Sequence, residues 1–376
     1  MKNMSAETNK ASGTKIYFAP LEGITGFAYR NTHQSLFSGV DKYFTPFVAP
    51  NYTHHMKTRE REDIAPRNNE GVRLVPQILT NRAEDFLWAA GEIYAMGYRE
   101  INLNLGCPMP TVVKKHRGSG QLGDPDELDR FLEEICAGMD RQFGLIQDQD
   151  TRDPRPSEAD RADRAGCPGA DPGPASHGPA AGETGPARDG LRFSIKTRIG
   201  LESSARAGDL LEIYNRYPLQ ELIVHPRTQR DLYGGSPDLE IFAMFLEGSV
   251  NPVVYNGDIF TGEDFAHWKD RFPSCGPVMI GRGMIADPAL AREITGGAAL
   301  TKEELRRFHD AVFTALRDTL PGQAPLIGKM KELWFYMGRN FEDADRYLKE
   351  IRKAGDLVRY AAAVRTLFAQ CPFREK

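Results

Sequence analysis

Short hydrophobic runs alternate with longer amphipathic stretches between Lys15 and about Ala299. The amphipathic stretches, such as residues 82–97 and 124–139, repeat their apolar positions at helical spacing. The hydrophobic runs have the length of strands, and each leads into a loop or a helix. Eight such units in succession predict an α/β fold, a parallel (β/α)₈ TIM barrel. The eight runs cover residues 15–20, 42–47, 73–79, 99–105, 192–199, 221–226, 251–257 and 276–281.

An open doubly wound sheet is the alternative, and the lack of a G-x-G-x-x-G motif after the first run disfavours it. After Thr301 the pattern changes to four helical stretches with no strand-like run between them. We therefore expect a barrel domain over residues 15–300 and a small all-helical domain over residues 301–376. Residues 1–14 read as a disordered polar tail without the apolar segment of a secretory signal.

The segment 147–190 interrupts the barrel pattern. It contains no Val, Leu, Ile, Met, Phe, Tyr or Trp, so it cannot bury enough apolar surface to offset its ordering entropy. We expect a disordered insert on the face of the barrel opposite the active site. Residues 148–189 carry 5 Arg against 9 acidic residues, whereas residues 301–376 carry 15 Lys and Arg against 11 acidic residues. The formal net charge of −4 argues against bulk attraction to nucleic acid, but the C-terminal region is locally basic.

The remaining composition limits the cellular setting. No run reaches the ~18 apolar residues of a membrane span, so we expect no membrane partner. The five cysteines are widely spaced and form no C-x-x-C pair, which disfavours a disulfide framework and a structural metal site. We expect a cytoplasmic, monomeric protein without a bound metal.

Polar or reactive residues recur at the ends of the predicted strands, where a TIM barrel places its active site. This recurrence suggests a cofactor lying across the barrel mouth. The strand-end residues are Ala19, Pro20, Leu21, Glu22, Gln77, Asn102, Asn104, Cys107, Lys196, Arg198, His225, Arg227, Asn256, Gly257, Asp258, Gly281, Arg282 and Gly283.

Cys107 lies between Gly106 and Pro108, in a turn that follows a predicted strand. A lone cysteine is more often a small core residue than a catalyst, but this position favours an exposed thiol acting as a nucleophile or a general acid. The glycine-rich segment 115–125 that follows is either a flexible loop or an active-site lid. It lacks the Lys-Ser/Thr ending of a P-loop.

Lys196 and Arg198 alternate along one strand and therefore point to the same face. They form either a solvated outward pair or an inward pair that meets an anion such as a reduced flavin. The segment 278–288 follows the last strand and opens a helix, so its backbone N–H groups could hold a phosphate together with the preceding loop at 256–259.

Seven ordered motifs give the chain a resemblance to the tRNA-dihydrouridine synthase family over about residues 15–295. They read APLEGITG, PQIL, NLNLGCP, SIKTRIG, VHPRT, YNGDI and IGRGMIADP. The helical C-terminal region resembles the tRNA-binding domain of that family. The resemblance implies an FMN-dependent oxidoreductase that reduces the C5–C6 bond of specific tRNA uridines, with NADPH reducing the flavin.

The resemblance also implies roles for individual residues. Cys107 matches the general acid that protonates C5 of uracil. Asn104, Arg198 and Arg227 are candidate substrate contacts. The FMN phosphate would lie on Asn256, Gly257, Asp258, Gly281 and Arg282, and the ring would lie on Ala19, Pro20 and Leu21, with Gln77, Lys196 and His225 at its edge.

The chain departs from the family pattern in its first motif, where Leu21 and Gly26 replace the common Met and Asp, and in the fifth, where Pro226 and Gln229 replace Gly and Lys. We expect FMN binding to survive the first departure, whereas the second affects a loop that could contact substrate or phosphate. Two other functions are compatible with the sequence: an FMN barrel enzyme acting on a small molecule, such as a dihydroorotate or dihydropyrimidine dehydrogenase, and a non-catalytic RNA-binding protein. The basic helical tail disfavours the first, and the Cys107, Lys196 and His225 set disfavours the second.

Overall fold

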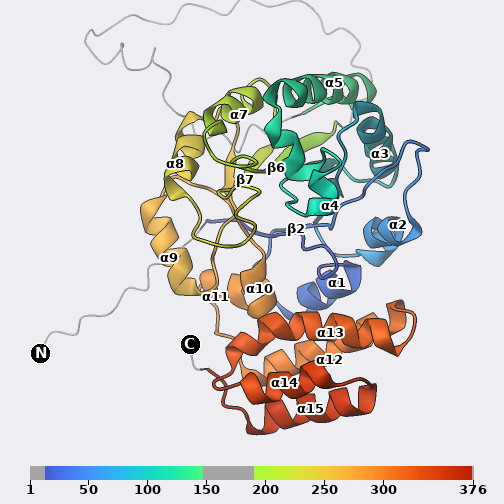
Figure 1. The fold of residues 1–376 in the computed structure, drawn as a ribbon, viewed down its shortest axis with the longest axis vertical. Coiled ribbons are helices and arrows are strands. Elements are labelled where there is room, and N and C mark those ends of the chain that lie inside the picture. The colour runs from blue at the N-terminus through green and yellow to red at the C-terminus, as the bar shows by residue number, and fades with distance from the viewer. Residues whose placement is uncertain (1–12, 147–189, 375–376) are drawn as a thin grey trace, which may run out of the picture.

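A computed structural model describes residues 13–146 and 190–374 of the chain (Figure 1). Within these ranges nine short strands form one parallel sheet in the order β3-β2-β1-β9-β8-β7-β6-β5-β4. The predicted (β/α)₈ barrel is confirmed, because every predicted hydrophobic run contains at least one of these strands. The strands are β1 (Ile16–Phe18), β2 (Lys42–Phe44), β3 (Leu74–Val75), β4 (Gln77–Ile78), β5 (Glu100–Leu105), β6 (Arg192–Arg198), β7 (Glu221–His225), β8 (Val253–Tyr255) and β9 (Val278–Ile280).

The two ends of this sheet belong to one interrupted strand. Only Pro76 separates β3 from β4; β3 pairs with β2, and β4 pairs with β5. Proline has no N–H to donate, so the ladder breaks there. The carbonyl of Pro76 still accepts the N–H of Asn102 at 2.9 Å. The nine strands therefore close as eight, which is why one predicted run, residues 73–79, contains two of them.

Alternation of side chains along the strands separates an inner core from an outer one. Tyr17, Phe44, Ile223, Val254 and Met279 pack in the inner cluster, within the barrel. Their neighbours along the strands join the larger cluster between the sheet and the surrounding helices. These helices are α1 (Phe27–Leu36), α2 (Thr58–Ile64), α3 (Ala83–Ala95), α4 (Pro110–Val113), α5 (Pro125–Phe143), α7 (Ala207–Tyr214), α8 (Leu239–Gly248), α9 (Gly262–Arg271), α10 (Arg282–Ala286) and α11 (Leu290–Ile294), with 3₁₀ turns at Pro66–Asn68 and Gly118–Gly123.

Buried charges close the amino-terminal end of the barrel. The ammonium of Lys42 lies 2.6 Å from Glu100 and 3.2 Å from Glu221, and the Tyr17 hydroxyl donates to Glu221 at 2.5 Å. Because each charge has a partner, this end of the barrel is filled rather than open. The cavity described below lies at the opposite end.

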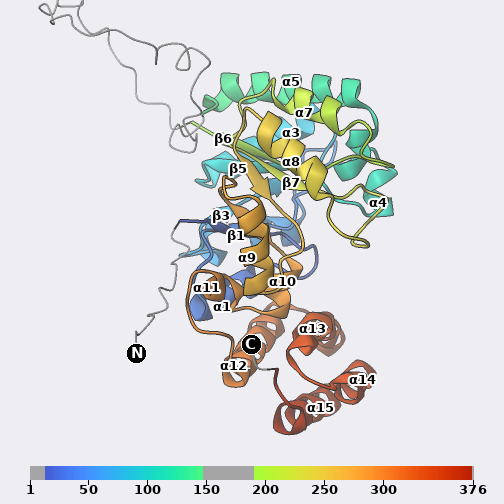
Figure 2. The same cartoon turned by 90° about the vertical axis from the view of Figure 1, so that its left-hand side faces the viewer.

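The C-terminal region is helical, as predicted, and packs against the barrel edge (Figures 1 and 2). Phe308 makes edge-to-face contacts with Tyr29, which lies in α1, and with Phe37, which directly follows α1. The Asn340 amide donates to the carbonyl of Ala286 at 2.6 Å. The helices are α12 (Lys302–Thr319), α13 (Gln323–Met337), α14 (Asp345–Lys353) and α15 (Leu357–Gln370), with a 3₁₀ turn at Gly338–Asn340.

The predicted insert at 147–190 and tail at 1–14 lie almost entirely outside the described residues. The described ends of the insert lie beside each other: Leu145 bridges Leu191, one residue before β6 begins. Since β6 begins at the amino-terminal end of the barrel, both ends of the insert are there. None of the helices in the described ranges is long and apolar enough to cross a membrane.

Candidate active site

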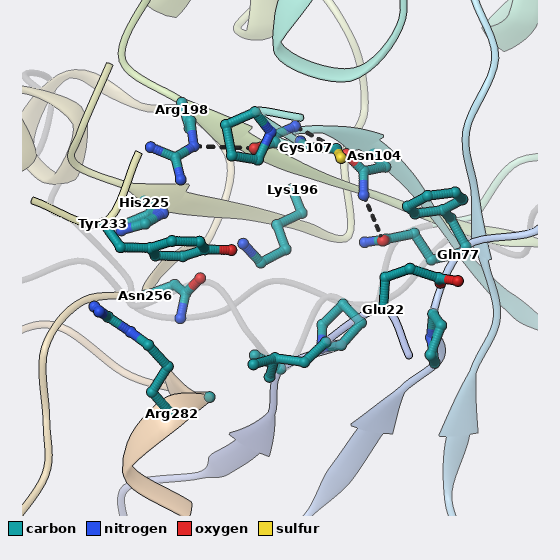
Figure 3. A pocket seen from close by; sticks show the side chains of 18 of the residues that line it. Glu22, Gln77, Asn104, Cys107, Lys196, Arg198, His225, Tyr233, Asn256 and Arg282 are labelled. Atoms are coloured by element: carbon teal, nitrogen blue, oxygen red, sulfur yellow. Dashed lines mark hydrogen bonds between the residues drawn. The ribbon is translucent and has the colours of Figure 1, made fainter. Parts of the chain in front are cut away.

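One cavity opens at the carboxyl ends of the barrel strands (Figure 3). Figure 3 shows Gln77, Lys196, Tyr233 and Asn256 reaching it from separate elements. Asn102 and Gly283, two of the predicted strand-end residues, do not line it. It contains every residue to which the resemblance assigns a role except Arg227. These residues are Ala19, Pro20, Leu21, Gln77, Asn104, Cys107, Lys196, Arg198, His225, Asn256, Gly257, Asp258, Gly281 and Arg282.

A chain of amide hydrogen bonds fixes the turn that carries Cys107. The Asn104 side-chain oxygen accepts the backbone N–H groups of Gly106, at 3.0 Å, and of Cys107, at 2.8 Å. Its amide nitrogen donates to Gln77 at 2.7 Å, and Gln77 donates in turn to Asn102 at 2.7 Å. All three amides lie in a buried layer of the barrel, where unpaired polar groups are costly. The strands therefore determine where the Cys107 turn lies.

The thiol of Cys107 lies in the cavity, half-buried. Burial raises its pKa above the ordinary value for cysteine, against opposing effects of a backbone hydrogen bond and the charges of Arg198 and Lys196. The glycine-rich segment folds back on the same turn, since both the N–H and the hydroxyl of Ser119 donate to the Cys107 carbonyl. At neutral pH this thiol holds a proton that it can donate.

Lys196 reaches into the centre of the cavity without an internal partner. Among the described residues, no carboxylate or carbonyl accepts a hydrogen bond from its ammonium, and burial, with the charge of Arg198, lowers its pKa to about 7. Burial and the surrounding cations also depress the pKa of His225 well below its ordinary value. An anion placed here would gain from the cations and would favour the charged form of Lys196. Of the two arrangements that the sequence left open, an outward pair and an inward pair, the structure shows the inward one.

Arg198 and Arg227 direct most of their donors to the protein itself. Arg198 donates to the carbonyls of Gly106, Thr228 and Leu232 and so braces the loop after β7. Arg227 does not line the cavity. It pairs with the Asp258 carboxylate at 2.6 Å and donates to two loop carbonyls.

The loops after β8 and β9 form a tight concave surface. A Cβ at Gly281 would lie 3.2 Å from Leu21 and 3.3 Å from Ala19, and one at Gly257 would collide with the Tyr255 ring. At both positions a side chain would crowd the protein's own residues, so glycine keeps the loop backbone at the wall of the cavity. Asp258 also accepts a hydrogen bond from Arg282, so two guanidiniums neutralise its carboxylate and keep this surface suitable for an anion.

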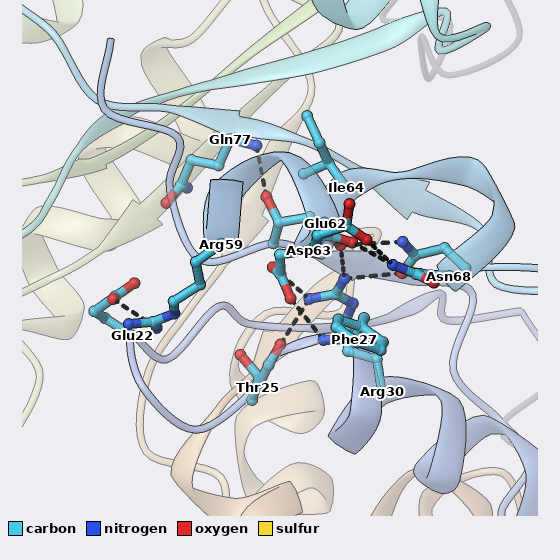
Figure 4. A network of polar contacts seen from close by, with 12 residues as sticks. Glu22, Thr25, Phe27, Arg30, Arg59, Glu62, Asp63, Ile64, Asn68 and Gln77 are labelled. Carbon is cyan, nitrogen blue, oxygen red and sulfur yellow. Dashed lines mark hydrogen bonds and ion pairs between the residues drawn. The ribbon is translucent and has the colours of Figure 1, made fainter. Parts of the chain in front are cut away.

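The segment 19–26 forms a further wall of the cavity and is anchored from behind (Figure 4). Leu21 and Thr25 hydrogen-bond each other, and the Thr25 carbonyl accepts the buried guanidinium of Arg30 at 2.7 Å. Arg30 also contacts Asp63 and Asn69, and Asp63 accepts the N–H of Phe27 at 2.6 Å. Helices α1 and α2 thus hold this wall in place.

Sequence reasoning missed several residues that complete the cavity. Tyr233, on the long loop after β7, lies under Arg198 and Arg282, whose guanidiniums are 5.6 Å and 4.8 Å from its ring centre. Tyr336 extends into the cavity from α13. No strand-end rule could find them, because one lies mid-loop and the other in the helical tail. Gln229, one of the departures in sequence, donates to the Pro108 carbonyl at 2.9 Å and so ties its loop to the Cys107 turn.

Comparison with known proteins relates the chain to a family and to several relatives. The sequence model described as "Dihydrouridine synthase (Dus)" matches residues 17–142 and 188–369. A tRNA-dihydrouridine(16) synthase of Neisseria meningitidis serogroup B is 25% identical over 373 residues, covering 95% of this chain and 94% of the relative. One from Aquipseudomonas alcaligenes is 24% identical, covering 92% and 97%.

Solved structures provide a fold-level likeness alone. Morphinone reductase in complex with tetrahydroNAD is 14% identical, with a TM-score of 0.45, covering 76% of this chain and 88% of that one. A 2-naphthoyl-CoA reductase complex is 10% identical, with a TM-score of 0.49, covering 75% and 50%.

Proposed function

Since this chain belongs to the dihydrouridine synthase family, we propose that it reduces the C5–C6 double bond of a tRNA uridine to 5,6-dihydrouridine, using FMN as its flavin and NADPH as the reductant. One observation carries the proposal: a single cavity at the barrel mouth gathers a protonated thiol, a lysine without a partner among the described residues, and a glycine-lined concave surface. The relatives that match along nearly their whole length are named for uridine 16, so we propose that position as the target.

The residues present fit FMN. The backbone of Asn256, Gly257 and Gly281, with the guanidinium of Arg282, would hold the phosphate, while Asp258 would hold that guanidinium in place. The ring would rest on the Ala19–Leu21 segment, with Gln77, Lys196 and His225 at its edge. Lys196 supports this assignment, because a buried amine without a partner is costly until an anion reaches it. Bound FMN, once reduced, would supply a hydride to C6 of the uracil.

Cys107 would supply the proton. As C6 of the uracil gains a hydride, C5 takes the proton of the thiol, and the resulting thiolate regains a proton from solvent. The charges of Lys196 and Arg198 would stabilise that thiolate while it exists. Asn104 would hold the uracil or the flavin beside the thiol. Three N–H groups of Arg198 already donate to loop carbonyls, so Arg198 would contact substrate only through its remaining N–H groups. Arg227 would act on the site through Asp258.

The helical region 301–376 would position the tRNA as a separate binding domain. Its basic residues suit contacts to phosphate and 2′-hydroxyl groups, which dominate RNA recognition. A uridine must leave its stack to reach a barrel mouth, so we expect the target base to be flipped out. Tyr336 of α13 lies where the tail and the cavity meet and would face that base.

Incubating the FMN-loaded protein with NADPH and unmodified tRNA, followed by position-resolved mapping of dihydrouridine, tests the proposal. We expect dihydrouridine at position 16. Oxidation of NADPH by a small pyrimidine without any tRNA modification would instead favour a small-molecule flavoenzyme, and a protein that binds tRNA but no flavin would favour a non-catalytic binder.

A further inference from the structure

A second recess opens at the carboxyl ends of the strands, beside the loop that carries Cys107. It is formed by the loops that follow β2, β4 and β5, and it shares no lining residue with the catalytic cavity. Because these loops leave the same end of the barrel, the recess faces the side from which a large substrate must approach. Its lining residues include Tyr52, Asn81, Arg82, Asp85, Lys115 and Arg117.

Hydrogen bonds hold the walls of the recess together. The Asn81 amide donates to the Lys115 carbonyl at 3.3 Å and accepts from Arg117 at 3.4 Å. Gln121 donates to the Thr80 carbonyl at 3.1 Å, a further hydrogen bond between the loop after β4 and the loop after β5. The loop of Lys115 and Arg117 is therefore fixed against the start of α3.

Asp85, in the first turn of α3, presents a buried carboxylate that lacks a donor. Its side chain is 1% exposed, and neither oxygen has a hydrogen-bond partner within the described parts of the chain. Its longer-range contacts are with the His54 ring, at 3.7 Å, and with the Arg82 guanidinium, at 3.8 Å, both beyond hydrogen-bond distance. A buried acceptor without a donor destabilises the folded protein, and more so when it is charged. The cost is recovered if a ligand brings a hydroxyl or amine donor.

The other groups in the recess suit the remaining parts of a nucleotide. Lys115 is exposed and Arg117 half-exposed, so both can reach a phosphate. Tyr52 is 78% exposed, so its ring is available to stack on a base. A carboxylate that accepts the 2′-hydroxyl would distinguish RNA from DNA.

We propose that this recess binds one ribonucleotide of the tRNA, next to the uridine that enters the catalytic cavity. Lys115 and Arg117 hold its phosphate, and Asp85 accepts its 2′-hydroxyl. The inference rests on the proposed function, because tRNA supplies the occupant. It adds a binding site on the barrel itself to the helical region.

A double variant, Lys115→Ala with Arg117→Ala, tests the phosphate contacts in the FMN-loaded full chain. Its matched control replaces Arg130 and Arg141, two exposed arginines of α5, with Ala. We expect the tRNA Kd of the first variant to rise about tenfold at 0.15 M salt, and the slope of log Kd against log salt to shrink by about 2, one for each phosphate contact. The control keeps the wild-type Kd and slope.

Asp85→Asn tests the carboxylate by a readout that separates binding from structure. Because the native carboxylate lacks donors, we expect Asp85→Asn to unfold at a higher temperature than the wild type while binding tRNA more weakly. A tRNA with a 2′-deoxy substitution next to the target uridine should bind the wild type more weakly. The same substitution should weaken binding to Asp85→Asn less, because in a double-mutant cycle the effects of two groups that contact each other are not additive.

The outcomes separate this inference from the function on which it rests. If the wild type forms dihydrouridine but the Lys115/Arg117 double variant keeps its Kd and salt slope, the recess does not bind tRNA. A rise in the KM for NADPH with an unchanged tRNA Kd would assign the recess to the reductant and overturn the proposal. If the wild type forms no dihydrouridine, the proposed function itself fails.

Discussion

Replacing Arg30 with Met should both destabilise the protein and loosen the catalytic cavity. The guanidinium is 1% exposed and donates four hydrogen bonds, to Thr25, Asn69 and both the carboxylate and the carbonyl of Asp63, at 2.6–3.1 Å. Methionine fills similar space but leaves all four acceptors without this donor.

The magnitude follows from what remains after the substitution. Removing one partner of a buried ion pair costs about 3–5 kcal/mol, because the other charge stays buried. Asp63 still accepts the hydrogen bond from the N–H of Phe27, and its side chain is 16% exposed. We therefore expect the loss in unfolding free energy to lie at the lower end of this range, about 3 kcal/mol. The Thr25 carbonyl also loses its anchor, which frees the segment carrying Leu21 to shift. A displacement of this kind lowers turnover, here by about tenfold.

Chemical denaturation of the purified protein measures the first effect, and flavin-fluorescence titration with single-turnover rates measures the second. Arg59→Met is the control, since its ion pair with Glu22 is exposed on both sides, at 75% and 50%, and contributes about 0–1 kcal/mol. Arg30→Met with Asp63→Asn should cost at least about 1 kcal/mol less than the sum of the single variants. An Arg30→Met protein as stable as Arg59→Met would refute this reasoning.

Four further outcomes are expected. Cys107→Ala should keep FMN but lose most dihydrouridine formation, by about 10²–10⁴-fold in single-turnover rate, because the proton donor is gone; full activity would remove its assignment as general acid. Without FMN, Lys196 should make the stability rise with pH between about 7 and its unfolded pKa of 10.5, because the unfolded chain binds the extra proton there; thermal unfolding of Lys196→Met should lack that rise, and an unchanged pH slope would contradict the lowered pKa. Gly283→Ala should unfold at a clearly lower temperature, since its Cβ would lie 2.0 Å from the Ile259 carbonyl oxygen; a wild-type Tm would count against that close approach. Replacing residues 147–189 with a short Gly-Ser linker should leave turnover unchanged, because Leu145 and Leu191 lie side by side at the end of the barrel opposite the cavity. A large loss of turnover would contradict that expectation.

The sequence predicted the barrel well because each strand is a hydrophobic run and each strand end carries polar residues. That rule places Gln77, Asn104, Lys196 and Asn256 in one cavity, since the carboxyl ends of parallel strands converge. Alternation along the strand also predicts that Lys196 and Arg198 share a face, but it does not say that this face is the inner one.

Other features depend on contacts that no local pattern encodes. Arg227 shares the strand-end pattern but turns onto Asp258, because a carboxylate from the next loop lies within reach. Tyr233 and Tyr336 enter the cavity from a long loop and from the helical region, and the path of neither follows from periodicity. The anchoring of Thr25 by Arg30 joins α1 to α2 and becomes visible only in three dimensions.

The most direct test of the proposed function is to map dihydrouridine in unmodified tRNA after incubation with the FMN-loaded protein and NADPH, with Cys107→Ala alongside. We expect a yellow protein that modifies position 16, and a Cys107→Ala variant that stays yellow but leaves the tRNA almost unmodified. Flavin-loaded wild-type protein that oxidises NADPH yet forms no dihydrouridine at any tRNA position would contradict the assignment.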